Sequence, residues 1–134
     1  MKYKEVKEYY DSGQLERHYF IDETGDMHGE YREYHDNWQL SWHHFGHIGN
    51  DYGEVKEFTH EGTLQYHYLK DGKGNELANV IDCDKPVTHS EEQLIKIAKE
   101  HNLPLLSELP KTEAELTLWK LKWPDLPLLP IESK

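Results

Sequence analysis

The segments Glu5-Val6-Lys7-Glu8-Tyr9, Glu30-Tyr31-Arg32-Glu33-Tyr34 and Glu54-Val55-Lys56-Glu57-Phe58 decide the fold. They recur with offsets of 25 and 24 residues and keep their chemical type at five consecutive positions. Repetition at a fixed period of this length is typical of a tandem supersecondary unit. The N-terminal half is therefore predicted to contain three copies of one unit.

The same register aligns turn residues between the copies. Gly13, Trp38 and Gly62 occupy one position, each two residues before a leucine. Glycine permits the positive φ of a tight reversal, and the flanks are rich in Tyr, Val, Phe and Trp, which favour strands. Each copy reads as strand, turn, strand, turn. Three β-hairpin repeats over residues 1–77 predict a meandering antiparallel sheet of about six strands, so the fold class is mainly β with a C-terminal α part.

Residues 78–134 are predicted to form a helical cap and a proline-rich tail packed on the sheet. Asn79 to Val87 reads as a linker. Ser90-Glu91-Glu92-Gln93 is a capping box that opens a helix to about Asn102, and Thr112-Glu113-Ala114-Glu115 opens a second short helix. Trp123 to Ile131 holds three prolines and is expected to be extended.

The second helix is apolar on both sides. Leu116 and Trp119 lie on one side, and Leu118 and Leu121 lie on the other. We expect this helix to be sandwiched between the sheet and the tail, with a surface kept for a partner as the alternative. The tail is expected to strap across the domain, and a docking peptide for another chain is its alternative.

Composition limits the classes of function. The 134 residues carry a formal charge of −11, which opposes attraction to nucleic acid and to anionic lipid. No segment approaches the roughly 20 apolar residues of a membrane span. Cys83 is the single cysteine, so an internal disulfide is ruled out and a reducing, cytoplasmic location is predicted.

The repeat resembles the MORN-type repeat, in the variant found in bacterial proteins described as antitoxin components. Gly29 to Tyr34 and Gly53 to Phe58 match its Gly-x-x-x-x-Tyr part, and Gly13-Gln14-Leu15 and Gly62-Thr63-Leu64 match its Gly-x-Leu turn. Trp38 stands where the motif has its turn glycine, so we expect a distorted hairpin that presents the Trp38 side chain. The resemblance covers about residues 3–77. It implies an extended sheet used for protein association, sometimes near membranes, and usually no catalysis.

Candidate partner-binding residues follow from the alternation of side chains along a strand. Glu5, Lys7 and Tyr9 share one face with their equivalents, and the neighbouring positions share the other. The repeated rings are interpreted as a core ladder bordered by charges, or as a recognition surface. The candidates are the aromatic residues Tyr9, Tyr34, Phe58, Trp38 and Trp42 and the acidic residues Glu8, Glu33 and Glu57.

Histidines are abundant, and His18, His43 and His67 share one repeat position. Equivalent positions in successive hairpins lie about 10 Å apart, too far for ligands of one zinc ion. His43 and His44 are adjacent in a strand and point to opposite faces. No metal or other cofactor is therefore predicted, and cross-strand pairing or solvation is favoured. Up to Leu77, 16 acidic and 8 basic residues accompany eight histidines, so protonation near pH 6.5 would cancel most of the charge.

No phosphate-binding loop or nucleophile motif is present, and no enzyme activity is predicted. The favoured function is a protein–protein interaction module of the antitoxin or immunity type. Such a module would bind a basic surface of another protein. One alternative is an acidic nucleic-acid mimic that inhibits a nuclease or a DNA-binding protein. Another is a structural subunit anchored by Leu126 to Ile131, and self-association stays open.

Overall fold

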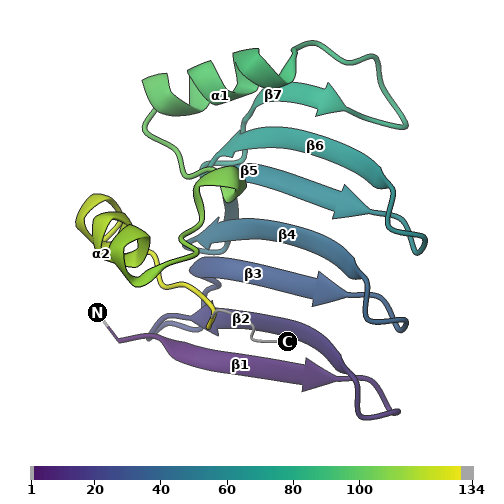
Figure 1. The fold of residues 1–134 in the computed structure, drawn as a ribbon, viewed down its shortest axis with the longest axis vertical. Helices are drawn as coiled ribbons and strands as arrows, with labels where there is room; N and C mark the ends of the chain where they lie inside the picture. The colour runs from purple at the N-terminus through teal and green to yellow at the C-terminus, as the bar shows by residue number, and fades with distance from the viewer. Residues whose placement is uncertain (1, 131–134) are drawn as a thin grey trace.

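The protein is described from a computed structural model, in which residues 2–130 are placed well enough to describe. Seven antiparallel strands form one sheet in sequence order (Figure 1). The strands are β1 (Lys4–Tyr9), β2 (Leu15–Ile21), β3 (Gly29–Tyr34), β4 (Leu40–His47), β5 (Asn50–Phe58), β6 (Leu64–Asp71) and β7 (Glu76–Ile81). The predicted fold class is confirmed, with one strand more than expected.

The additional strand β7 corrects the predicted linker. Asn79 to Ile81 belong to the sheet, where Ala78 and Asn79 pair with β6. The repeat period ends before this segment, so the repeat gives no signal for it. Pairing with β6 protects the edge that the third hairpin would otherwise leave open.

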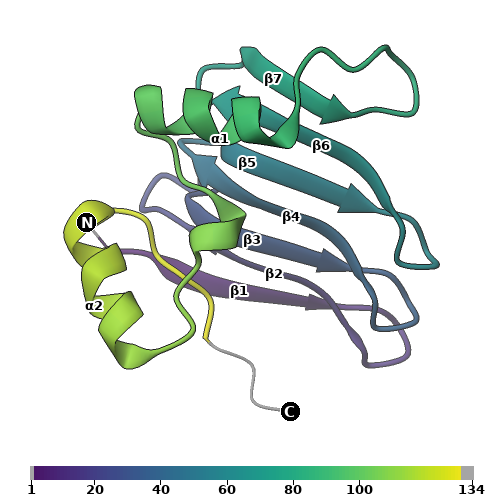
Figure 2. The same ribbon diagram turned by 45° about the horizontal axis from the view of Figure 1, so that its top comes forward.

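The three copies fold alike down to a shared irregularity. The strand pairing shifts by one residue at Glu8/Tyr9, at Glu33/Tyr34 and at Glu57/Phe58, which are equivalent positions. A bulge repeated at one place is a property of the repeat unit. The three hairpin turns that follow these shifts project at one end of the sheet (Figure 2).

The central hairpin is not distorted, which corrects one expectation. Trp38 adopts φ +70°, close to the turn glycines of the other copies, and is 68% exposed. Its backbone N–H donates to His35 O at 3.2 Å, as Gly13 donates to Tyr10 O at 2.9 Å. The turn is therefore kept at the expense of backbone strain, and the expected presentation of the indole is confirmed.

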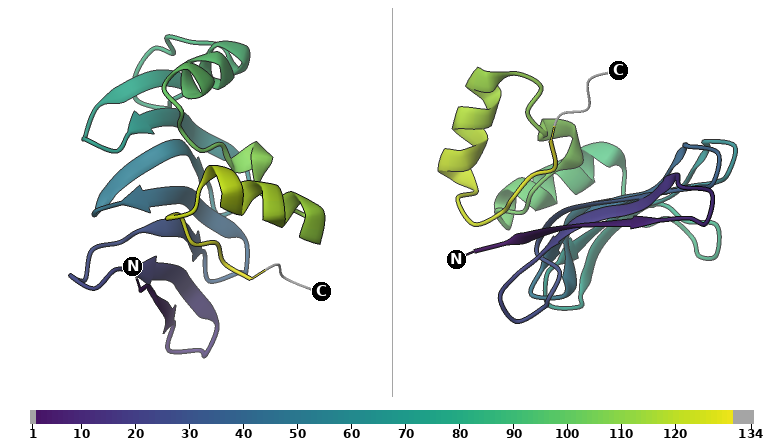
Figure 3. Two further views of the ribbon diagram at one scale, coloured as in Figure 1. Left: turned by 90° about the vertical axis from the view of Figure 1, so that its left-hand side faces the viewer. Right: turned by 90° about the horizontal axis from the view of Figure 1, so that it is seen from below.

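Three helical segments follow the sheet and lie on one of its faces (Figure 3). They are α1 (Glu91–Glu100), the 3-10 turn η1 (Leu106–Glu108) and α2 (Glu113–Lys122). The Ser90 capping box is complete, but only the Thr112 half of the second one forms, because Glu115 accepts the Lys111 N–H instead. Among residues 2–130, no helix has the length and apolar character to cross a membrane.

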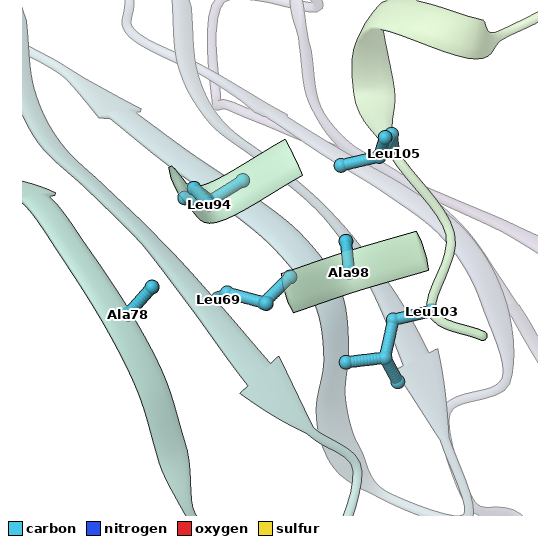
Figure 4. Close-up of a cluster of buried hydrophobic side chains, with 6 residues drawn as sticks. All are labelled: Leu69, Ala78, Leu94, Ala98, Leu103 and Leu105. Atoms are coloured by element: carbon cyan, nitrogen blue, oxygen red, sulfur yellow. The ribbon is translucent and has the colours of Figure 1, made fainter. Parts of the chain in front are cut away.

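Two buried clusters join the helical part to the sheet. One lies between α1 and the strands β6 and β7, and Figure 4 shows its members, which are Leu69, Ala78, Leu94, Ala98, Leu103 and Leu105. The other lies below α2, where Phe45 stacks on Trp119 with ring centroids 5.7 Å apart. Burial of these side chains holds the C-terminal part on the sheet.

The sandwich predicted for α2 is wrong. Leu118 and Leu121 are 67% and 76% exposed, while Trp119 is buried against the sheet. The tail does not cover the outer side of α2, because it turns back onto the sheet. There Leu126 and Leu129 are buried, which confirms the strap. Ile131, the last residue of the proposed anchor, lies outside the described residues.

Candidate functional site

Each repeat carries one cross-strand pair of a glutamate and a histidine. The histidine Nε2 donates to the glutamate in the pairs His18–Glu5, His43–Glu30 and His67–Glu54. Each pair joins the two strands of one hairpin and spans 13 residues. Of the two arrangements expected for the repeated histidines, cross-strand pairing or solvation, the structure shows the pairing.

Glu30 accepts three hydrogen bonds. Its Oε2 accepts from His43 Nε2 and from Arg32 Nε, both at 2.9 Å, and its Oε1 accepts from the Leu129 N–H at 2.9 Å. Burial alone would raise the pKa of Glu30, but these donors and the Arg32 charge outweigh it and lower the pKa. The carboxylate is therefore ionised and binds the tail.

The tail reaches Glu30 through a second hydrogen bond. The Glu30 N–H donates to Pro127 O at 2.9 Å. Pro127 lies directly over Gly29, where an added Cβ would stand 2.5 Å from the proline Cγ. Only glycine permits this approach, and its φ of +104° also favours glycine.

The third repeat binds a different segment by the same contacts. The Glu54 N–H donates to Pro104 O at 3.0 Å, and the Leu106 N–H donates to Glu54 Oε1 at 2.7 Å. A Cβ on Gly53 would stand 2.7 Å from Pro104 Cγ. Burial would raise the pKa of Glu54, yet the His67 hydrogen bond and the nearby donors lower it.

The two docked segments are identical in sequence, and sequence reasoning missed them. Leu103-Pro104-Leu105-Leu106 and Leu126-Pro127-Leu128-Leu129 stand 23 residues apart, close to the period of the repeats that hold them. This repeated tetrapeptide was the feature of the sequence from which the two docked segments could have been predicted. We call the pairs Gly29–Glu30 and Gly53–Glu54, with their histidines, the Gly-Glu sites.

The first repeat has no such site. Lys4 stands where the other copies have glycine, and in the described part of the chain Glu5 binds only His18. The Glu5 side chain is 40% exposed, against 2% for Glu30 and 3% for Glu54. Two docking segments thus match two Gly-Glu sites.

The opposite face of the sheet is not covered by the helical part (Figure 3). A row of side chains crosses six strands there, because each residue pairs with the next on the neighbouring strand. We call it the acidic row, and its members are Glu8, Arg17, Glu33, Trp42, Glu57 and Tyr66.

Tyrosines hold the glutamates of the acidic row in place. Tyr31 donates to Glu33 at 2.6 Å and Tyr68 donates to Glu57 at 3.1 Å. Burial, with the charges of Asp51 and Glu33, raises the pKa of Glu57. This carboxylate therefore lacks a compensating cation, which is what a basic partner would supply.

The structure divides the predicted partner-binding residues between two faces. Glu8, Glu33, Trp42 and Glu57 come together in the acidic row. Tyr9, Tyr34 and Phe58 lie on the face of the Glu–His pairs instead, near the hairpin turns, and Trp38 stands on a turn. The core-ladder interpretation is wrong, since Tyr9 is 57% exposed, Tyr34 and Phe58 are half-buried, and other residues form the buried clusters.

Adjacent histidines on β4 take opposite faces, as predicted. His43 binds Glu30, whereas His44 stacks on Tyr31 with ring centroids 4.6 Å apart. Burial lowers the pKa of His44 and of His47, so these two do not share the titration near pH 6.5 that was expected of all the histidines. Within residues 2–130, no group of three or more potential ligands could hold a metal ion.

A groove of about 950 Å³ lies between η1, α2 and the tail. Its lining is mostly leucine, proline and tryptophan, with Arg32, Lys111 and Lys120 as cations. The Trp119 Nε1 at its wall finds no acceptor among the described residues. Leu106 and Leu129 also line it, so the shape of the groove depends on docking at both Gly-Glu sites.

The chain matches no family model, no curated protein and no solved structure. The resemblance to MORN-type repeats therefore stays a prediction from the residues.

Proposed function

We propose that this chain is a non-enzymatic protein-interaction module whose acidic row binds a basic surface of another protein. One observation carries the proposal. The chain covers one face of its sheet with its own C-terminal half and leaves on the other face a continuous row of carboxylates and rings across six strands.

The chemistry of the row suits a protein partner. Its glutamates recur once per repeat, and Arg17 is its one cation, already paired with Glu8 at 3.5 Å and Glu33 at 3.3 Å. Trp42 and Tyr66 add broad rings, which are enriched at protein interfaces.

The likeness to MORN-type repeats makes an antitoxin or immunity-type inhibitor the favoured form of this module. The regular spacing of Glu8, Glu33 and Glu57 also supports a second candidate, an acidic mimic of a nucleic-acid backbone. The two differ in a competition test. DNA would displace a mimic from its target enzyme, whereas it would leave an ordinary interaction module bound.

The third candidate is a structural subunit of a larger assembly. Leu126 and Leu129 of its expected anchor are buried in the chain itself, so the exposed outer side of α2 supports this candidate instead. Leu118 and Leu121 form an apolar patch there without cover from residues 2–130. The double substitution Leu118→Ser and Leu121→Ser would abolish assembly in that case. It would leave binding at the acidic row unchanged.

The test compares matched charge variants in cells of the native host. We expect Glu33→Gln with Glu57→Gln to remove a co-purifying basic protein. Glu61→Gln with Glu100→Gln removes the same charge from an exposed turn and an exposed helix end, and should keep the partner. Binding should also weaken as salt rises. Equal retention by both double variants, or binding insensitive to salt, would contradict the proposal.

A further inference from the structure

The docked tail behaves as a ligand of the sheet, and this points to a second binding activity. We propose that the Gly-Glu sites recognise Leu-Pro-Leu-Leu segments. We further propose that the site on the second repeat accepts such a segment from another protein in exchange for the chain's own tail. This activity uses the face opposite the acidic row and does not depend on the function proposed above.

The repetition of the contacts shows that they form a rule. At each site the glutamate N–H donates to the proline carbonyl, and the N–H of the leucine two residues later donates to glutamate Oε1. Two segments from different parts of the chain meet this rule at equivalent repeat positions. The ligand thus supplies one acceptor and one donor at fixed spacing, and its leucines bury apolar surface.

Glycine and proline make the site selective. The proline ring occupies the volume where any other residue would place its Cβ, so the site needs glycine at its first position. Lys4 breaks this requirement in the first repeat, where no segment among residues 2–130 docks on Glu5. The histidine and Arg32 hold the glutamate charged and oriented toward the incoming N–H.

The second-repeat site is the one that can exchange its occupant. The segment at the third repeat joins α1 to η1, and Leu103, Leu105 and Leu106 belong to the buried clusters. Its release would open the core. The segment at the second repeat follows α2, the last helix within residues 2–130, and Leu128 is only half-buried. Its release exposes Leu126 of the cluster below α2 but leaves the cluster around Leu94 intact.

The incoming segment is assigned to a different protein because of charge. The chain carries a formal charge of −11, and two copies would repel one another on approach. The proposed partner therefore presents an extended Leu-Pro-Leu-Leu segment and has little negative charge around it. A tail exchanged between two copies of this chain is a distinct outcome that the test detects.

The test uses a fluorescent synthetic peptide with the sequence of residues 123–130 and the full chain. In the wild type, the tethered tail competes at an effective concentration in the millimolar range. Leu129→Ala weakens this internal competitor and keeps the site intact. We expect the variant to bind the peptide at least tenfold more tightly than the wild type, measured by anisotropy. Pro127→Ala serves as a second weakened tail, in case Leu129→Ala fails to fold.

Paired controls on a weakened-tail background decide the mechanism. Gly29→Ala should abolish peptide binding, whereas Gly25→Ala should preserve it, because both glycines have positive φ but only Gly29 contacts the tail. A scrambled peptide should not bind. Equal affinity of wild-type and weakened chains, or of both peptides, would overturn the proposal. Concentration-dependent dimerisation of the weakened chain would overturn the assignment to a different protein.

Discussion

Replacing Gly29 by alanine is expected to release the tail from the second repeat. The added Cβ would stand 2.5 Å from Pro127 Cγ and 2.6 Å from Pro127 O, so the segment must move away. Gly25→Ala is the matched control. Gly25 has φ +88° against +104° for Gly29, and an added Cβ there meets no atom within 4 Å.

The magnitude follows from the contacts that are lost. Both variants share a backbone strain of about 1 kcal/mol in the free energy of unfolding. Gly29→Ala also loses two hydrogen bonds, about 1 kcal/mol each, and part of the burial of Leu126 and Leu129, about 2 kcal/mol for each leucine if fully exposed. Gly29→Ala should therefore exceed the control by about 2 to 4 kcal/mol.

Urea unfolding followed by tryptophan fluorescence measures this difference. Trp119 and Trp123 lie beside the tail, so their emission should also shift toward longer wavelength in folded Gly29→Ala and stay unchanged in Gly25→Ala. Free energies of unfolding that agree within about 0.5 kcal/mol would refute the role assigned to the glycine.

Four further predictions test the buried charges and the strained turn. Glu30→Gln should reduce the free energy of unfolding by about 3 kcal/mol in urea titrations, because it leaves Arg32 and His43 without their carboxylate. Trp38→Gly should raise the free energy of unfolding by about 1 kcal/mol in thermal unfolding, because it removes the strain of a tryptophan in the left-handed backbone region. Glu57→Gln should be more stable than the wild type at neutral pH, since the raised pKa of Glu57 means that the folded state disfavours its charge. The lowered pKa of His44 makes stability fall as pH drops below 6.5, and His44→Phe should remove up to about 1.4 kcal/mol of the loss between pH 6.5 and 5.5 in parallel urea titrations.

The sheet could be predicted from the sequence because its determinants are local and repeated. Five positions in each copy carry the alternation of one strand, and the turn residue that follows fixes the hairpin. Trp38 did not break this pattern, because neighbouring repeats and the hairpin hydrogen bonds outweigh the strain of one residue. The Ser90 capping box likewise reports a local event, the start of α1.

The remaining features depend on contacts between distant segments. β7 is a strand because β6 offers it an edge and α1 covers it. The exposure of Leu118 depends on where the tail runs, and that path is set by Gly29 and Glu30, about 100 residues earlier in the chain. The acidic row, in turn, needs the register of all six strands, and its glutamates stay predicted partner-binding residues.

Photo-crosslinking in the native host tests most directly whether the uncovered sheet face binds the partner. Benzoylphenylalanine at position 66 replaces Tyr66 in the acidic row, and at position 118 it replaces Leu118 on the outer side of α2. The interaction proposed here predicts a crosslinked product with a basic protein from position 66 and none from position 118. A product from position 118 alone would contradict it.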